Sequence, residues 1–286
     1  MASVFMRFPG GRVKAVTLSY DDNVEDDVRL VQTMKKYGLK GTFNINSGQF
    51  SPEGSVGDVF KCGHRRLTVN QSVELHRDSG MEIACHGVTH PFLEQLPTGL
   101  CVHEVLQDRL DLERIFGCMV RGLAYPFGTY SDEVVSVLRN CGIAYARTAE
   151  STHRFDLPTD WLRMNGTCRH ADPELMDLAK RFVTDGRNTS PMLFLLFGHS
   201  YEFGDTQTWQ IIEEFAEFIG GREDIWYATN IEICDYVNAY RQLIFSADGI
   251  NVHNPTNTEL FVGTDSGVIS ILPGETKKVK EWSNVK

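Results

Sequence analysis

Carboxylate and imidazole side chains occur in this chain where apolar, strand-like runs end. Asp21-Asp22 follows the run Val13–Tyr20, and adjacent side chains of an extended chain point to opposite sides. One carboxylate can therefore hold a cation while the other faces a substrate. The alternative interpretation is a solvated turn in which Asp22 lies near the N-cap of the next helix.

Two histidines lie at an equivalent position after the strand-like run Met81–Cys85. His86 and His90 are four residues apart, so both imidazoles project to one side if the segment turns helically. Isolated His-x-x-x-His pairs are common, but here a carboxylate follows an equivalent strand. Two histidines and one Asp make a three-ligand site with an open position for water, and Zn²⁺ bound this way lowers the pKa of that water to ~7.

Two further positions complete a predicted hydrolytic site. His199 follows the apolar run Met192–Phe197, where it can protonate a leaving group; the alternative is a core histidine bonded to backbone. The turn Tyr125–Gly128 can present the Phe127 backbone N–H to a developing oxyanion, an interaction worth ~3 kcal/mol, although most Pro/Gly turns are only turns.

A neighbouring carboxylate and a large aromatic ring are candidates for supporting positions. Asp160 can orient His199, and Trp161 can offer a platform for a sugar ring. The alternative is a packed tryptophan beside a surface aspartate.

Elements that can position these residues alternate from residue 13 to about 241. Repeated strand–helix units predict parallel strands, and about seven units predict an α/β fold, a distorted (β/α)7-type barrel with its chemistry at the carboxyl ends of the strands. Asn46–Asn70 is a loop long enough to indicate function. Residues 1–242 are the predicted barrel, and residues 243–286 a small β-rich C-terminal appendage packed on it, with a separate sugar-binding module as the alternative.

Composition narrows the classes of partner. The 286 residues carry a net charge of −10, which disfavours nucleic acid because phosphates require clustered Lys and Arg. No run approaches the ~20 apolar residues of a membrane helix, and no secretory signal is visible. The seven cysteines form no Cys-x-x-Cys pair, so we expect a reducing, cytoplasmic location.

These residues, in this order, resemble the polysaccharide deacetylase family with the NodB homology domain, which is carbohydrate esterase family 4, over residues ~13–241. The family motifs Thr-Phe-Asp-Asp-Gly, His-Ser/Thr-x-x-His, Arg-Pro-Pro-Tyr-Gly and Leu-x-His correspond to Ser19–Asn23, His86–His90, Ala124–Gly128 and Phe197–His199, and a further motif to Asp160-Trp161. The resemblance implies Asp21 as general base and His199 as general acid. It also implies one divalent cation, Zn²⁺ foremost with Co²⁺, Ni²⁺ or Mn²⁺ as alternatives, on Asp22, His86 and His90, and substrate contacts at Tyr125 and Trp161.

Three positions depart from the family pattern. Asn23 replaces a glycine, and Gly87 replaces a hydroxyl residue that steadies the metal loop. Ala124 replaces the arginine that braces the catalytic Asp in the family; the candidates to substitute for it are Arg121, Arg147 and Arg163.

We expect a metal-dependent hydrolase that removes an acetyl group from an N- or O-acetylated carbohydrate. Two alternatives stay open at this point. One is a hydrolase of another small amide, such as a ureide, on the same scaffold. The other is a non-catalytic carbohydrate-binding protein with a degenerate site, which the missing arginine makes conceivable.

Overall fold

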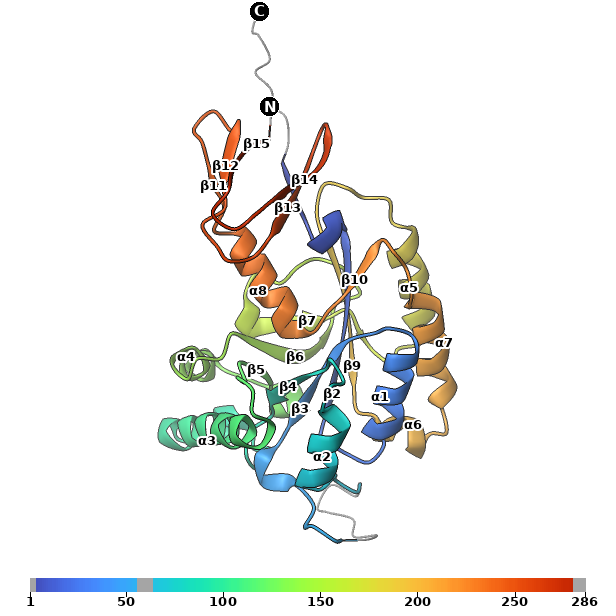
Figure 1. Ribbon diagram of the computed structural model, residues 1–286. Coiled ribbons are helices and arrows are strands. Elements are labelled where there is room, and N and C mark those ends of the chain that lie inside the picture. The colour runs from blue at the N-terminus through green and yellow to red at the C-terminus, as the bar shows by residue number, and fades with distance from the viewer. Residues whose placement is uncertain (1–3, 56–63, 280–286) are drawn as a thin grey trace, which may run out of the picture.

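The computed structural model describes residues 4–55 and 64–279 (Figure 1). Residues 56–63 include Cys62 and the middle of the predicted loop Asn46–Asn70, and they lie outside the described residues. No helix in the described part is long and apolar enough to cross a membrane.

A parallel sheet forms the centre of the molecule. Its strands are β2 (Lys14–Asp21), β3 (Gly41–Ile45), β4 (Glu82–Cys85), β5 (Gly122–Ala124), β6 (Tyr145–Ser151), β7 (Met164–Gly166), β8 (Cys168–Arg169), β9 (Met192–Gly198) and β10 (Ile225–Tyr227). They bond in the order β7-β6-β5-β4-β3-β2-β9-β8, and β10 pairs with the first half of β2. Only Thr167 separates β7, which pairs with β6, from β8, which pairs with β9, so this segment closes the sheet. The predicted distorted barrel is confirmed.

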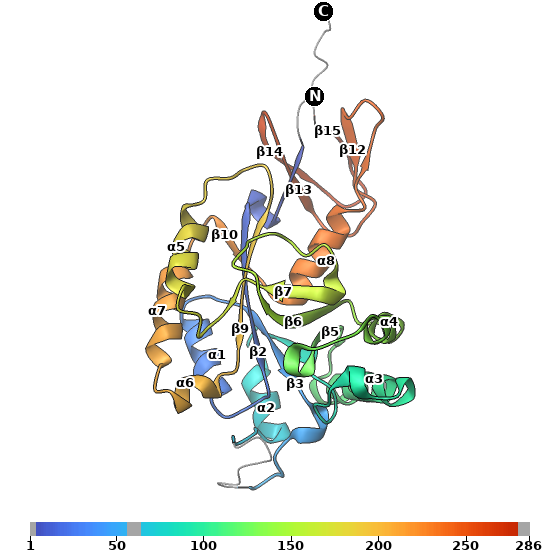
Figure 2. The same cartoon turned by 180° about the vertical axis from the view of Figure 1, so that it is seen from behind.

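Eight helices flank the strands in the described residues. They are α1 (Asp27–Lys36), α2 (Val69–His76), α3 (Thr98–Phe116), α4 (Asp132–Asn140), α5 (Leu175–Thr184), α6 (Tyr201–Asp205), α7 (Trp209–Ile219) and α8 (Asn230–Tyr240). Figures 1 and 2 show α1, α5 and α7 along one flank of the sheet and α3 and α4 along the other. Capping boxes begin α2 and α8, where Thr68 pairs with Gln71 and Thr229 with Glu232.

The first helix begins later than its apolar spacing predicts. The pattern extends from Val24, but α1 starts at Asp27 because the Val24 N–H donates to the Asp27 carboxylate at 3.0 Å. Val24 forms an isolated bridge with Arg66 instead. This bridge brings the end of the long loop next to the end of β2.

The two faces of β2 determine what its last residue touches. Val16, Leu18 and Tyr20 belong to the larger core, which packs against the flanking helices. On the opposite face Ala15 packs in a second core with residues of α8. Further along that face the residues become polar, with Thr17, Ser19 and Asp21. The strand is thus buried on both faces, and its polar stretch leads to the carboxyl end of the barrel.

Antiparallel strands cover the amino-terminal end of the barrel. They form the sheets β1-β13-β14 and β11-β12-β15, from β1 (Phe5–Arg7), β11 (Ile244–Phe245), β12 (Asn251–His253), β13 (Leu260–Thr264), β14 (Gly267–Ile271) and β15 (Thr276–Lys278). Because β1 pairs with β13, the first residues of the chain share a sheet with the C-terminal segment. The boundary at residue 242 stays a prediction.

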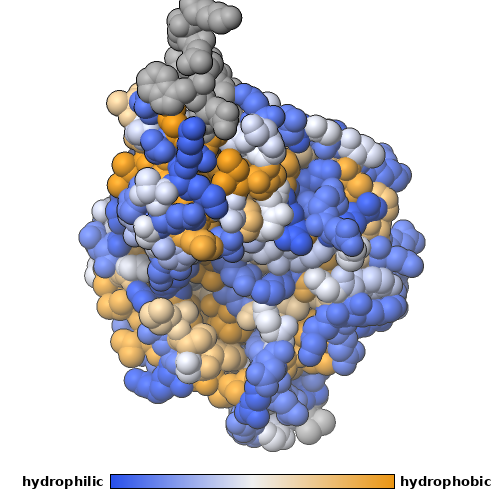
Figure 3. Space-filling model, turned by 45° about the horizontal axis from the view of Figure 1, so that its top comes forward, coloured by the Kyte–Doolittle hydropathy of each residue, from blue (hydrophilic) through white to orange (hydrophobic). Residues whose placement is uncertain are grey.

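These strands lie at the opposite end of the barrel from the carboxyl ends of its strands (Figures 1 and 2). Figure 3 shows hydrophobic side chains at the surface of this end among hydrophilic neighbours. The large exposed apolar residues of the segment are Ile244, Phe245, Val268 and Leu272.

Replacement of Phe194 tests the core between β9 and the helices. Phe194 is fully buried and contacts the rings of Phe155, Phe182 and Phe215. Phe194→Ala leaves a cavity, so we expect the free energy of unfolding in urea to fall by about 3–5 kcal/mol. Leu272→Ala, at an exposed position, serves as control and should change it by less than about 0.5 kcal/mol. Equal effects of the two substitutions would contradict this description of the core.

Candidate active site

A cavity of about 650 Å³ opens at the carboxyl ends of the barrel strands. Seven of the nine predicted site residues line it: Asp21, Asp22, His86, His90, Tyr125, Phe127 and His199. Asp160 and Trp161 are not among its lining residues. The cavity therefore collects side chains that are far apart in the sequence and that come from the carboxyl ends of four strands, β2, β4, β5 and β9.

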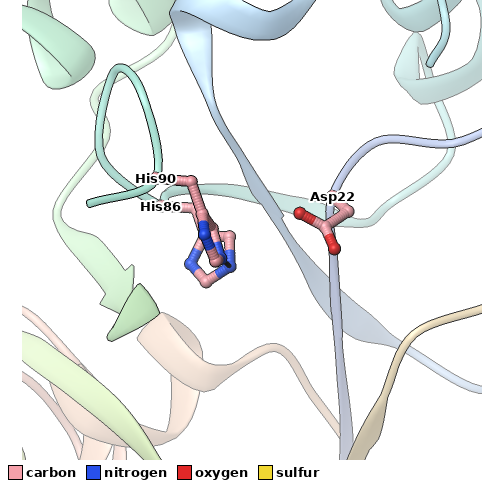
Figure 4. Close-up of side chains that lie close together, drawn as sticks. All are labelled: Asp22, His86 and His90. Carbon is pink, nitrogen blue, oxygen red and sulfur yellow. Dashed lines mark hydrogen bonds between the residues drawn. The ribbon is translucent and has the colours of Figure 1, made fainter. Parts of the chain in front are cut away.

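Asp22, His86 and His90 face one another across a small space (Figure 4). Each offers one ligand atom, and these atoms all lie within 4.8 Å of one another. The two imidazoles come closest, with 3.1 Å between their Nε2 atoms. Two nitrogens and one carboxylate oxygen form a donor set that suits Zn²⁺ and related divalent ions.

The His86–His90 segment is not helical, so the predicted helical turn is wrong. Gly87 and His90 have φ of +75° and +60°, and this left-handed backbone folds the segment back so that both rings meet. The Asn46 side chain holds the segment by donating to the carbonyls of His86 and Gly87, the latter at 2.8 Å. The Asp108 carboxylate accepts the His86 backbone N–H at 2.9 Å.

Each of the two histidines has one ring nitrogen available for a cation. His86 Nδ1 donates to the Ala124 carbonyl at 2.8 Å, which leaves the Nε2 lone pair facing His90 and Asp22. Burial lowers the pKa of His86, and burial together with the charge of His86 lowers the pKa of His90 to about 4. The neutral imidazole, which is the form that binds a metal, therefore predominates at neutral pH.

Asp22 has a buried oxygen whose geometry fits a bound cation. Its Oδ1 lies 3.0 Å from Arg66 Nη2 but accepts no hydrogen bond from the described residues. Arg66 Nη1 donates to the Asp22 carbonyl and to Asn46 Oδ1, so the guanidinium is held from several sides. A carboxylate oxygen of Asp22 and the lone pairs of His86 and His90 together fit a divalent ion.

Arg147 occupies the place of the arginine that is missing at Ala124. It stands opposite Ala124 in the register of the neighbouring strand β6, and its Nη2 donates to both oxygens of Asp21, at 2.6 Å to Oδ1. Of the three arginines considered, Arg147 is therefore the one that contacts Asp21. Burial raises the pKa of Asp21, but Arg147 and the nearby histidines outweigh it and lower this pKa to about 2.

The other two departures have local structural explanations. Asn23 has φ of +53°, a region that glycine adopts freely and asparagine tolerates, and its Oδ1 accepts a hydrogen bond from the Ser72 hydroxyl at 2.7 Å. No hydroxyl is available at Gly87, but the Thr89 hydroxyl donates to Glu104 at 2.8 Å. A hydroxyl two residues further along thus anchors the loop that carries both histidines.

His199 directly follows β9 and contacts Glu202, not Asp160. Its Nδ1 lies 2.8 Å from the Glu202 carboxylate, and its Nε2 lies 3.8 Å from both Asp21 and Asp22. Burial lowers the pKa of His199, but the hydrogen bond to Glu202 and the two aspartates outweigh it and raise this pKa above its usual value. Asp160 instead accepts from the Leu162 N–H and the Arg163 guanidinium, so its predicted contact with His199 is wrong.

The predicted turn presents an aromatic wall to the cavity. Phe127 has φ of +59°, stacks on Phe92 with ring centroids 3.8 Å apart and meets the His90 ring edge-on. The Tyr125 ring lines the cavity while its hydroxyl donates to the Leu162 carbonyl at 2.8 Å. Trp161 is buried in the second core, which contradicts its prediction as a sugar platform.

Sequence reasoning missed several lining or supporting residues, among them Arg66, Arg169, Tyr201 and Glu202. Only Glu202 carried a local signal, because it lies three residues after His199 and close to it if a helix follows. Arg66 belongs to the loop whose length indicated function, but nothing in that loop singled it out.

Removal of Arg147 tests the buried ion pair. Arg147→Met leaves the Asp21 carboxylate buried without its guanidinium, so we expect the free energy of unfolding at pH 7 to fall by about 3–5 kcal/mol. The folded-state pKa of Asp21 is depressed, so the stabilisation exists above the usual aspartate pKa of about 4 and is lost as the pH falls through about 2. The difference in free energy of unfolding between wild type and variant, measured in urea, should therefore become smaller below pH 4.

A double variant separates the lost charge pair from a lost packing contact. Asp21→Asn in the Arg147→Met background removes the unpaired charge and should recover part of the stability. If the double variant is no more stable than Arg147→Met, the ion pair does not account for the loss.

Comparisons with known proteins agree with this fold. Residues 9–146 match the model of the family described as polysaccharide deacetylase. A candidate polysaccharide deacetylase of Mycobacterium smegmatis has the same fold, with a TM-score of 0.56 and 16% identity over 82% of this chain and 93% of that one. No curated protein sequence matches the chain significantly.

Two other solved structures are similar over part of their length. A deacetylase of Streptococcus pyogenes in complex with acetate has 23% identity and a TM-score of 0.45 over 51% of this chain, and the match spans 61% of that deacetylase. A family 4 carbohydrate esterase pseudoenzyme of Bacillus anthracis has 18% identity and a TM-score of 0.46 over 81% of this chain and 68% of its own. Over residues 9–146, the chain is thus similar to the polysaccharide deacetylase family.

Proposed function

We propose that this protein hydrolyses an acetyl amide or ester of a carbohydrate, with one divalent cation, Zn²⁺ foremost, held by Asp22, His86 and His90. The contact of Arg147 with Asp21 beside this triad is the observation that carries the proposal. When bound, the cation supplies Lewis acidity that polarises a carbonyl group and acidifies water, so that even a weakly basic carboxylate can take its proton.

The protein's own residues divide the proton transfers between them. Asp21, ionised at neutral pH, removes the proton of the water that attacks the acetyl carbon. The Phe127 backbone N–H donates to the oxygen that gains negative charge. His199 protonates the amine or alcohol as its bond to the acetyl carbon breaks, and acetate and the deacetylated sugar leave.

The charge arrangement supports catalysis over simple carbohydrate binding. A degenerate site was conceivable because Ala124 lacks the family's guanidinium, but Arg147 supplies one to the same carboxylate. Burying two aspartates, each beside a buried arginine, costs desolvation free energy, and a protein that only binds a sugar has no need of this arrangement. No comparable observation favours a ureide as substrate.

Asp21→Asn tests the assignment of the base. We expect this variant to lose acetate release from acetylated sugars by at least about 10²-fold, because an amide cannot accept the proton. Its metal content should stay near that of the wild type, since Asp21 is outside the triad. Acetate release from a panel of N- and O-acetylated sugars, with a ureide alongside, is the measurement.

The same panel distinguishes the alternatives. Binding of sugars by the wild type without acetate release would support a non-catalytic protein. Ureide hydrolysis without acetate release would support the other small-amide hydrolase. Full activity of Asp21→Asn would refute Asp21 as the base.

Loss of one histidine tests the cation site. His90→Ala removes one of three ligands, so we expect the metal content by elemental analysis to fall well below one per chain at micromolar free zinc, together with the activity. His103→Ala, at an exposed position on α3, is the matched control and should keep the wild-type content. Equal metal content in both variants would exclude the triad as the binding site.

A further inference from the structure

Glu202 joins three side chains at the edge of the cavity. Its Oε1 lies 2.8 Å from His199 Nδ1 and also accepts from the Arg169 guanidinium. Its Oε2 lies 3.0 Å from Nε2 of His170. Both oxygens of this carboxylate therefore have partners. Arg169 and His199 both line the cavity, and His199 is the partner that lies 3.8 Å from Asp21 and Asp22.

His170 is a buried support for this carboxylate. Its ring is stacked on Tyr20, with planes 5° apart and centroids separated by 5.7 Å, and it contacts Phe203 at 4.1 Å. Its backbone N–H donates to Phe197 at 3.0 Å. A Cβ on Gly198 would overlap the His170 imidazole, so the glycine before His199 makes room for this support.

The environment keeps Glu202 ionised. Burial raises the pKa of Glu202, but the hydrogen bonds from His170 and His199 and the charge of Arg169 outweigh it, and this pKa lies well below its usual range. A carboxylate held on both oxygens by donors has little freedom to rotate. Glu202 therefore offers His199 a fixed acceptor.

This acceptor determines which nitrogen of His199 faces the cavity. Because the Nδ1–H of His199 donates a hydrogen bond to Glu202, Nε2 is directed to the space between Asp21 and Asp22, 3.8 Å from each. A leaving group bound there would meet Nε2 and not Nδ1. The orientation of the ring thus follows from Glu202 and not from the strand that precedes His199.

We propose that Glu202, clamped by Arg169 and His170, is the positioning residue of His199, and that it fixes the tautomer and direction in which His199 protonates the leaving group. This inference rests on the proposed deacetylation. It replaces Asp160, which the motif order suggested for this task, with a residue one helical turn beyond His199 itself. The alternative is that Glu202 has only a structural role and connects α6 to β8.

Leaving-group dependence separates these two possibilities. An acetyl amide of a sugar needs a proton on its nitrogen as the bond breaks, whereas 4-nitrophenyl acetate releases a stable phenolate without one. In Glu202→Gln we expect kcat on N-acetylglucosamine oligomers to fall about 10–100-fold with KM little changed, and kcat on 4-nitrophenyl acetate to stay within about threefold.

Three comparison variants complete the kinetic test. His199→Ala should show the same selective loss on the amide, and the double variant Glu202→Gln/His199→Ala should lose no more than His199→Ala, because both act through one proton. Glu213→Gln on α7, which breaks an exposed ion pair with Arg29 of α1, is the matched control and should leave the activity on both substrates unchanged. An equal loss on both substrates in Glu202→Gln, or additive losses in the double variant, would overturn the proposal.

A spectroscopic measurement tests the positioning without any turnover. In protein labelled with ¹⁵N-histidine, the His199 signal, assigned by its absence in His199→Ala, should report a proton on Nδ1 in the wild type. Glu202→Leu removes the acceptor and should move the signal toward the other tautomer. If the tautomer is unchanged in Glu202→Leu, Glu202 does not position His199. If it changes but the wild type releases no acetate from any sugar, the deacetylase proposal fails while the positioning holds.

Discussion

Buried negative charge is the constraint on which this site depends. Asp21 ends a barrel strand that is buried along its whole length and Asp22 follows it, and two adjacent carboxylates in that position repel each other and lose their hydration. Each therefore lies beside a guanidinium from a different element, Arg147 from β6 and Arg66 from the loop before α2. These contacts determine which oxygen atoms remain for a cation, for water and for substrate.

The two faces of the barrel strands allow these charges to be buried. Residues of one face fill the core beneath the helices, and the other face changes from apolar to polar toward the carboxyl end. Ser19 shows the consequence, because its hydroxyl accepts from both Arg147 and Asn44, two side chains that also bond Asp21. Asp21 is thus part of a network that joins side chains of β2, β3 and β6 and leaves it little freedom to move.

Periodicity and strand ends made much of the fold and the candidate triad predictable. The sequence pattern predicts a strand at Gly41–Ile45 and a helix at Asp132–Asn140, and the structure has the same bounds, because local spacing and capping agree there with tertiary packing. The barrel strands Met164–Gly166 and Cys168–Arg169 were missed, since such short segments have no period and exist only through pairing with β6 and β9. The roles predicted for Asp160 and Trp161 were wrong, because a place in the order of motifs does not establish proximity to the cavity in space.

The sequence alone determined the chemical types of the site residues and their order along the chain. These are paired carboxylates at the end of the first barrel strand, two histidines four residues apart, and a further histidine after an apolar run. The pairing between those residues was decided only in three dimensions. Arg147 reached Asp21 because β6 is in register with the strand where the arginine is missing, and Glu202 rather than Asp160 reached His199 because a helix begins directly after β9. Register and helix placement are properties of the packed barrel as a whole, so no local pattern could contain them.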